Sequence, residues 1–117
     1  CADMLSYRPN KPFDKIIFYE AFHHCADHVQ LIKNLEQLLA PGGAVYFAGE
    51  PISDGFPMPW GIRLDGVSVW SIRRFGWLEL GFQIGYFLNL LRQQGWRVTR
   101  HDPHDIGWMK LFVAQRL

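Results

Sequence analysis

Acidic and imidazole side chains gather in one short part of this sequence, where they could do acid–base chemistry. Glu20 closes the apolar run KIIFYE, His23 and His24 follow it, and Glu50 closes a second apolar run, AVYFAGE. A histidine can accept a proton near neutral pH, and a carboxylate can orient such a histidine or hold a polar ligand. The pattern raises the question of which fold brings these side chains together.

Metal ligation is a second chemistry that this stretch suggests. His23, His24, Cys25 and His28 are four possible ligands in a short segment. Zinc sites usually draw their ligands from two separated pairs, whereas His24 and His28 are expected to straddle a junction between a loop and a helix. We therefore expect no metal site here.

The elements around these residues predict a strand–helix–strand unit over residues 15–50. The runs 15–20 and 44–50 are apolar on both faces, as strands of a covered parallel sheet are. Asp27 is a suitable N-cap for an amphipathic helix between them, and Pro41-Gly42-Gly43 is expected to end that helix. The apolar stripe of the helix consists of Val29, Ile32, Leu35, Leu38 and Leu39.

A unit of this size is typical of a right-handed crossover between two parallel strands. Ligands of open α/β sheets bind outside the carboxyl ends of parallel strands. The acids and histidines that follow the two strands are therefore expected to face a ligand crevice.

The remaining segments are expected to complete one domain. Residues 1–14 are predicted to be a loop, 67–74 a short helix, 78–94 a helix that ends at Gly95, and 96–102 and 108–115 an antiparallel pair of strands. The large aromatic side chains of this half are expected in the core rather than on a ligand platform; they are Trp70, Phe75, Trp77 and Tyr86.

Composition excludes several function classes. The chain has 117 residues, of which 49% are hydrophobic, and a formal net charge of +1. The densest basic cluster is only Arg73-Arg74, so no nucleic-acid partner is expected. No run reaches the roughly 18 apolar residues of a membrane span, and the two cysteines show neither zinc-type nor disulfide-framework spacing. We expect a cytoplasmic location, and the start at Cys1 suggests a piece of a longer protein.

The order of motifs resembles the second half of a class I S-adenosylmethionine-dependent methyltransferase. Phe13-Asp14 is similar to the residues that open the fourth strand of that fold, and His23-His24 to the histidine-bearing loop after it. Three further pieces are similar to the later helices and strands; they are LEQLLAPGG, LLRQQGWRV and GWMKLFVAQR. The resemblance implies a three-layer, Rossmann-like α/β sheet with parallel strands and an antiparallel terminal pair.

The resemblance also implies roles for particular residues near the cofactor. Asp3 would contact the adenine amino group with Met4 beside the ring, and Glu20 and Ala21 would lie beside the methionine part of S-adenosylmethionine. His24 would orient the nucleophile or accept its proton. The glycine-rich turn after the family's first strand has no counterpart, since no G-x-G occurs in the sequence, so the cofactor pocket is expected to be incomplete.

Substrate recognition would fall to the segment 51–77. Glu50 would line the entrance, and Trp60 and Arg63, with Asp65, could form an aromatic and polar floor for a polar acceptor such as a saccharide. A simple packing loop is the alternative for these residues. The chain 1–117 is thus expected to be a partial methyltransferase domain made of the parts 1–14, 15–50, 51–77 and 78–117.

Two functions follow as hypotheses. The first is methyl transfer from S-adenosylmethionine to a small-molecule acceptor. The second is a non-catalytic docking domain that retains the C-terminal half of the fold, with the aromatic segment 60–77 as its contact surface. Because the missing strands would leave a sheet edge unpaired, we also expect a homodimer formed through that edge.

Overall fold

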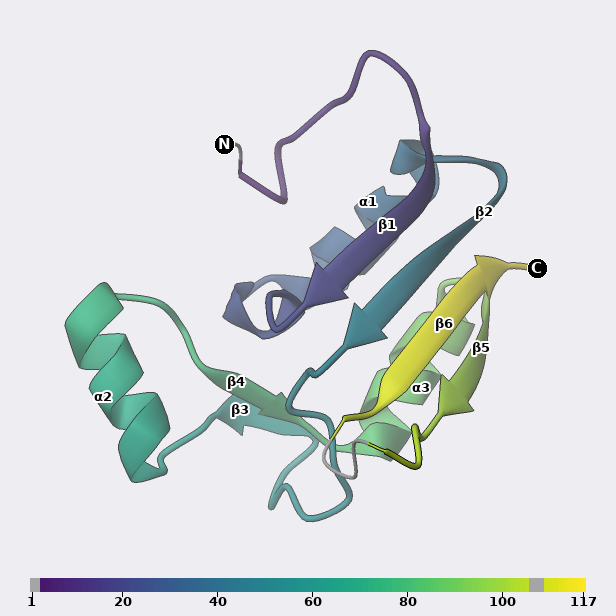
Figure 1. Ribbon diagram of the computed structural model, residues 1–117. Helices are drawn as coiled ribbons and strands as arrows, with labels where there is room; N and C mark the ends of the chain where they lie inside the picture. Colours follow the sequence, from purple (N-terminus) through teal and green to yellow (C-terminus); the bar gives the residue numbers. More distant parts are fainter. Residues whose placement is uncertain (1–2, 106–108) are drawn as a thin grey trace.

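A four-stranded sheet forms the centre of the molecule in the computed structural model, which describes residues 3–105 and 109–117. The strands are β1 (Phe13–Tyr19), β2 (Leu39–Ala48), β6 (Leu111–Arg116) and β5 (Trp96–His101), in this spatial order. β1 and β2 are parallel, whereas β6 is antiparallel to both β2 and β5 (Figure 1). The predicted mixed α/β sheet with an antiparallel terminal pair is confirmed; the predicted position Trp108 lies outside the described residues.

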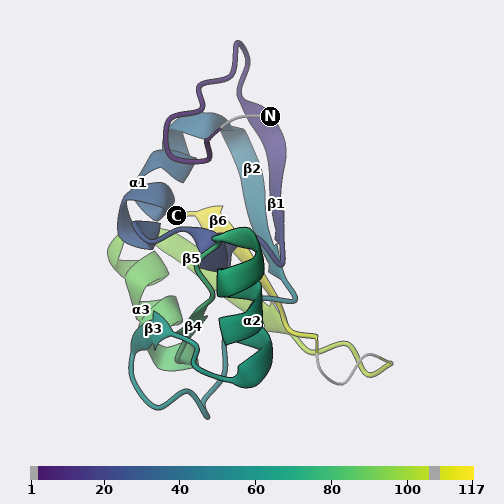
Figure 2. The same ribbon diagram turned by 90° about the vertical axis from the view of Figure 1, so that its left-hand side faces the viewer.

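Two helices pack on the same face of this sheet and build the core with it. They are α1 (His28–Leu38) and α3 (Ile84–Gln93), which lie side by side against the sheet in Figure 2. Leu31 and Leu35 of α1 and Phe87 of α3 join Phe47 and Phe112 of the sheet in one buried cluster. The opposite face of β1 is open, since Ile17 is 67% exposed. The expectation that this strand is covered on both faces is therefore wrong for the described chain.

The strand–helix–strand unit forms as predicted, with shifted boundaries. The Asp27 side chain accepts a hydrogen bond from the Gln30 backbone N–H at 3.1 Å and so caps α1. The helix ends at Leu38, and β2 begins at Leu39, five residues before the predicted Ala44, because Leu39 already pairs with the start of β1. The ladder is irregular there, where Gly42 adopts a positive φ of 79°.

A second, two-stranded sheet carries the segment between β2 and α3. Its strands β3 (Trp60–Ile62) and β4 (Leu80–Phe82) are antiparallel, and α2 (Gly66–Phe75) connects them. The short helix predicted over 67–74 is confirmed. Gly76 ends it in the left-handed conformation, with its N–H donating to the Ile72 carbonyl.

The helix predicted over 78–94 is wrong in its first part. Leu80–Phe82 is extended because it pairs with β3, and the helix starts only at Ile84. The apolar residues of this run are buried in either conformation, so their spacing does not distinguish a short buried strand from the first turn of a helix.

The expectation that the aromatic residues of this segment lie in the core is also wrong for three of them. Trp70, Phe75 and Trp77 are about half exposed, whereas Tyr86 packs against the core. Ser68 is the only buried residue of α2. The helix therefore stands beside the main body rather than inside it (Figure 1). Among the described residues, no helix is both long and apolar enough to cross a membrane.

Candidate functional site

A cavity of about 520 Å³ opens beside the carboxyl ends of the two parallel strands. In open α/β sheets this edge is where ligands bind. The lining residues come from the loops after β1 and β2, from residues 63–77 around α2, which we call the α2 segment, and from the residue before β4; they are Glu20, His23, His24, Gly49, Glu50, Pro51, Arg63, Val67, Trp77 and Glu79. Four residues predicted from the sequence, Glu20, His24, Glu50 and Arg63, are thus brought to one place.

Glu50 holds the loop that carries the histidines. Its Oε1 accepts hydrogen bonds from the backbone N–H groups of Ala21 and Phe22 at 2.8 and 2.9 Å. Its Oε2 accepts from the backbone N–H of His23 at 3.2 Å and lies 2.7 Å from Nδ1 of the same residue. These N–H groups begin the 3-10 helix η1 (Phe22–His24), so the carboxylate satisfies donors that the helix leaves free. The Glu50 side chain is 1% exposed, which fits an anchor for the loop.

His23 lies between two carboxylates. Nδ1 donates to Glu50, and Nε2 is 3.3 Å from Oε2 of Glu79. The ring is buried, and both of its nitrogens face acceptors. His23 therefore links two buried acids rather than offering a free lone pair to a substrate.

His24 has the opposite arrangement. Its Nδ1 is 2.6 Å from the carbonyl oxygen of Leu78. A carbonyl oxygen can only accept, so Nδ1 carries the hydrogen, and the lone pair of a neutral ring is on Nε2. The side chain is 25% exposed and lines the cavity. His24 can therefore take a proton from a ligand through Nε2.

Glu79 is a central residue that the sequence reasoning missed. Oε1 accepts a hydrogen bond from the Ser71 hydroxyl at 2.9 Å, and Oε2 accepts from Nη2 of Arg63 at 2.6 Å. Oε1 also lies 3.8 Å from Nδ1 of His24. Burial acts to raise the pKa of Glu79, but the Ser71 hydrogen bond and the positive charge at His23, His24 and Arg63 outweigh it, so the pKa is lowered. No sequence signal marks this residue, because it sits in the run that resembles a helix.

Arg63 and Trp60, which were predicted to form the floor of the substrate site together, lie in different surroundings. Arg63 lines the cavity and pairs with Glu79, while its buried Nε has no hydrogen-bond partner in the described part of the chain. The Trp60 ring packs against the ring of His28, with 4.7 Å between their centres, and does not line the cavity. Asp65 caps α2 by accepting from the Ser68 backbone N–H at 2.9 Å. Trp77, stacked on Phe75 with 4.7 Å between the ring centres, is the aromatic residue beside His24 instead.

Glu20 and Ala21 form the turn that leads from β1 into the site. The Glu20 backbone has a φ of 47°, which is unusual for a residue other than glycine, and its N–H donates to the Ala48 carbonyl at 3.1 Å. Its side chain is exposed at the cavity. The N–H of Ala21 is already used by Glu50.

Asp3 and Met4 lie at a separate place. Met4 lines an apolar cavity of about 370 Å³ formed by the N-terminal segment, β1 and α1, which shares no lining residue with the cavity beside His24. Asp3 is exposed, and its Oδ1 accepts from the backbone N–H of Leu5 at 2.7 Å. The predicted adenine contacts are therefore apart from the histidine site, and their role stays a prediction.

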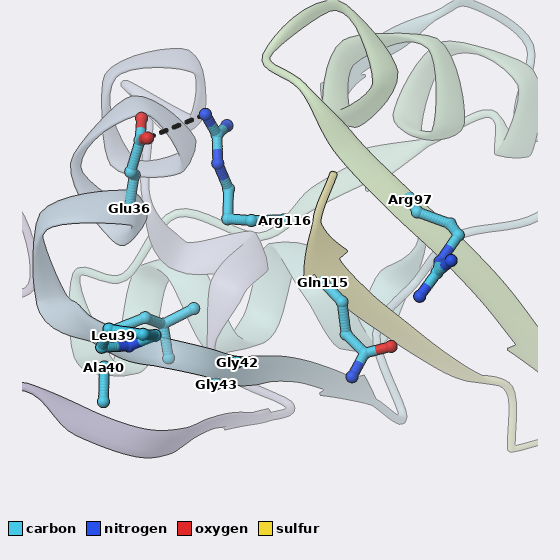
Figure 3. A pocket seen from close by; sticks show the side chains of 9 residues that line it. Glu36, Leu39, Ala40, Gly42, Gly43, Arg97, Gln115 and Arg116 are labelled. Carbon is cyan, nitrogen blue, oxygen red and sulfur yellow. Dashed lines mark ion pairs between the residues drawn. The ribbon is translucent and has the colours of Figure 1, made fainter.

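A third hollow lies at the opposite end of β2 and is not a candidate for the same chemistry. It is lined by the start of β2, the end of β6 and charged side chains that include Glu36, Arg97 and Arg116 (Figure 3). Glu36 and Arg116 form an exposed ion pair of 2.8 Å. The amino end of a parallel strand is not where open α/β sheets bind ligands.

The histidine site also contains a group that could hold a cation. His23, His24 and Glu79 offer ligand atoms that lie within 4.8 Å of one another. However, Nδ1 of His24 donates to a carbonyl, and the Glu79 carboxylate already faces the guanidinium of Arg63. Nε2 of His23 also faces Glu79, so two of the three residues already contact other groups, and we propose no metal here.

The comparisons with known proteins point to one family. The methyltransferase domain family matches residues 1–47. An O-methyltransferase family protein from Burkholderia thailandensis shares the fold with a TM-score of 0.70 at 20% identity, over 98% of this chain and 34% of that one. A comparison with curated proteins found no significant match.

Two further solved structures have the same fold. The glycopeptide N-methyltransferase MtfA has a TM-score of 0.70 at 14% identity, over 99% of this chain and 60% of that one. An S-adenosylmethionine-dependent methyltransferase from Mesorhizobium loti has a TM-score of 0.66 at 21% identity, over 98% of this chain and 68% of that one. The chain thus spans about a third of the length of the Burkholderia protein. The family match at residues 1–47 and the fold of the described residues make this chain similar to class I S-adenosylmethionine-dependent methyltransferases.

Proposed function

We propose that this chain supplies the acceptor side of an S-adenosylmethionine-dependent methyltransferase, with His24 as the group that receives the acceptor's proton. The observation that carries the proposal is the contact between Nδ1 of His24 and the Leu78 carbonyl, which directs the lone pair to Nε2. The ring lies at the cavity beside the carboxyl ends of β1 and β2, where the family places its substrates.

The cofactor would be bound by residues on two sides. Glu20 and Ala21 would lie beside its methionine part, and Asp3 and Met4 beside its adenine. The apolar cavity at Met4 supports the second assignment, because the flat face of adenine prefers apolar surroundings. Nothing in this chain corresponds to the glycine-rich turn, so the pocket would be completed by residues outside it.

The cofactor, when bound, supplies an electrophilic methyl group on a sulfonium. The chain's own residues would position the acceptor so that its oxygen or nitrogen lies in line with that methyl group. Nε2 of His24 would accept the proton that the acceptor loses. Glu50 and His23 would keep the loop in the geometry that this transfer requires.

The acceptor is proposed to be a small polar molecule, for which a saccharide is the best fit. The cavity is lined by acids, histidines and Arg63, which suit hydroxyl groups. The Trp77 ring lines the cavity, with Phe75 stacked on it, and could cover the apolar face of a sugar ring.

The proposal is tested with labelled S-adenosylmethionine and a panel of monosaccharides and phenols, using the full-length protein. We expect His24→Gln to lower kcat by about 10²–10⁴-fold while the affinity for S-adenosylhomocysteine is unchanged. His101→Gln, at an exposed position of β5, is the matched control. Unchanged kcat in His24→Gln would remove His24 from the reaction.

The docking alternative has one observation in its favour. Leu64 and Val67 are exposed beside Trp70 on the α2 segment, which makes an apolar surface that a partner protein could cover. This alternative requires that the full-length protein binds no S-adenosylhomocysteine. The same titration therefore separates the two functions.

A further inference from the structure

Two parts of the candidate site come from distant segments and meet at a single side chain. The histidine loop follows β1, whereas Arg63 and Ser71 belong to the α2 segment. Both parts contact the carboxylate of Glu79, which precedes β4 and is 8% exposed. Such a shared buried anion needs several partners to offset its loss of hydration.

We propose that Glu79 is a positioning residue, whose carboxylate fastens the α2 segment to the histidine loop and thereby sets the orientation of His24. The Ser71 hydroxyl ties α2 itself to Oε1 at 2.9 Å. Arg63, just before α2, ties the other end of the segment to Oε2 at 2.6 Å, and its backbone N–H donates to the Glu79 carbonyl at 2.8 Å.

The α2 segment has little else to hold it in place. Ser68 is the only buried residue of the helix, and the hydroxyl of Ser68 bonds the capping residue Asp65 of the same segment. Apolar burial therefore contributes little to its position. The contacts to Glu79 are accordingly the main attachments of α2 that lie at the site.

The link to His24 passes through the residue next to Glu79. The carbonyl that receives Nδ1–H of His24 belongs to Leu78, so the backbone at 78–79 must be held in place for this bond to form. On the other side, Nε2 of His23 is 3.3 Å from the Glu79 carboxylate, and the rings of His23 and His24 are 4.1 Å apart. Glu79 thus acts on His24 from both sides, through the backbone at Leu78 and through the ring of His23.

The test uses Glu79→Gln, which keeps the shape but removes the charge, with the surface variant Glu36→Gln as control. NMR detection of the imidazole nitrogens reports the tautomer of His24, and hydrogen exchange reports the opening of α2. We expect wild type and control to show Nδ1–H alone at His24. In Glu79→Gln we expect a mixture of tautomers and about tenfold or faster exchange in α2, the change expected on losing hydrogen bonds to a charged group.

Unchanged exchange in α2, or an unchanged His24 tautomer, would overturn the proposal. The hydrogen exchange of the backbone amides of β6 is the internal reference, because these amides exchange only when the whole domain opens. If Glu79→Gln does not fold, the variant Ser71→Ala tests the proposal instead, since it removes only the hydrogen bond between α2 and Glu79. Unchanged hydrogen exchange in α2 of Ser71→Ala would also overturn the proposal. The meaning for catalysis rests on the proposed function, but neither readout needs cofactor or acceptor, so the two proposals can fail separately.

Discussion

Nδ1 of His23 lies 2.7 Å from Oε2 of Glu50, although the two residues are 27 positions apart in the sequence. The contact joins the loop after β1 to the loop after β2, at the edge where the parallel strands end. Both side chains are buried, so each depends on the other to offset the loss of water.

Removing the Glu50 carboxylate should therefore lower the stability of the fold strongly. Glu50→Ala leaves His23 and three backbone N–H groups without their acceptor. We expect the free energy of unfolding to fall by about 3–5 kcal/mol, as for other buried pairs that lose one partner. Urea denaturation measures this, and Glu36→Ala at the exposed pair with Arg116 should cost at most about 1 kcal/mol. Equal losses in the two variants would show that Glu50 is no anchor.

Acid should destabilise the protein through His28. Burial lowers the pKa of His28 from its ordinary value of 6.5, although the Ala26 carbonyl and Asp27 act in the opposite direction. Nε2 is 2.8 Å from the Tyr86 hydroxyl, which can donate to it only when the ring is neutral. The unfolded chain therefore binds the proton more readily than the folded chain, and stability that is complete above pH 6.5 is lost as the pH falls below it.

The measurement is the free energy of unfolding between pH 7.5 and 5, obtained by urea denaturation. His28→Asn cannot titrate in this range, so its stability should decline less steeply with acid than that of the wild type. The mutant is expected to be less stable at pH 7.5, because a buried ring is lost. Parallel curves for the two proteins would exclude His28 as the source of the acid sensitivity.

Trp77 and Trp60, two of the exposed tryptophans of the segment 51–77, should differ in their effect on the binding of the acceptor. Trp77 lines the cavity and lies 5.3 Å from the ring of His24, whereas Trp60 packs on His28. Trp77→Ala should raise the KM for the acceptor about tenfold, which corresponds to about 1.4 kcal/mol of binding. Trp60→Ala should leave it nearly unchanged. Steady-state kinetics would refute this assignment if the Trp60 variant had the larger effect on KM.

The open edge of β1 should favour self-association. Within the described chain, β1 pairs with β2 alone, and Ile17 and Tyr19 are exposed on it. Unpaired backbone groups beside apolar side chains form a template for another strand. We expect this chain to form a dimer at high concentration, and Ile17→Lys to weaken the dimer. Sedimentation of the wild type as a monomer across the concentration range would contradict the expectation.

The central part of the fold could be predicted from the sequence because its signals are local. The apolar runs before Glu20 and Glu50, the Asp27 cap and the stripe of α1 each mark an element by its own residues. The resemblance to methyltransferases then placed His24 near the acceptor, and the structure puts it at a cavity on the expected edge.

The part around α2 could not be predicted, for two physical reasons. The spacing of the apolar residues in the run 78–82 fits both a buried strand and a helix. Only the pairing with β3 decides between the two conformations. Glu79 acquires its importance from Ser71, Arg63 and the histidines, contacts that appear only when distant segments meet. Trp77 was expected in the core because large aromatic residues usually are, yet little packs over α2.

The most direct test of the account is calorimetric titration of S-adenosylhomocysteine into the full-length protein and into this chain alone. The account predicts saturable binding to the full-length protein, weakened by Glu20→Ala at the turn after β1. It predicts weaker binding or none to the chain alone, because the glycine-rich turn has no counterpart in its sequence. Absence of binding to the full-length protein would contradict the methyltransferase account and favour a docking domain.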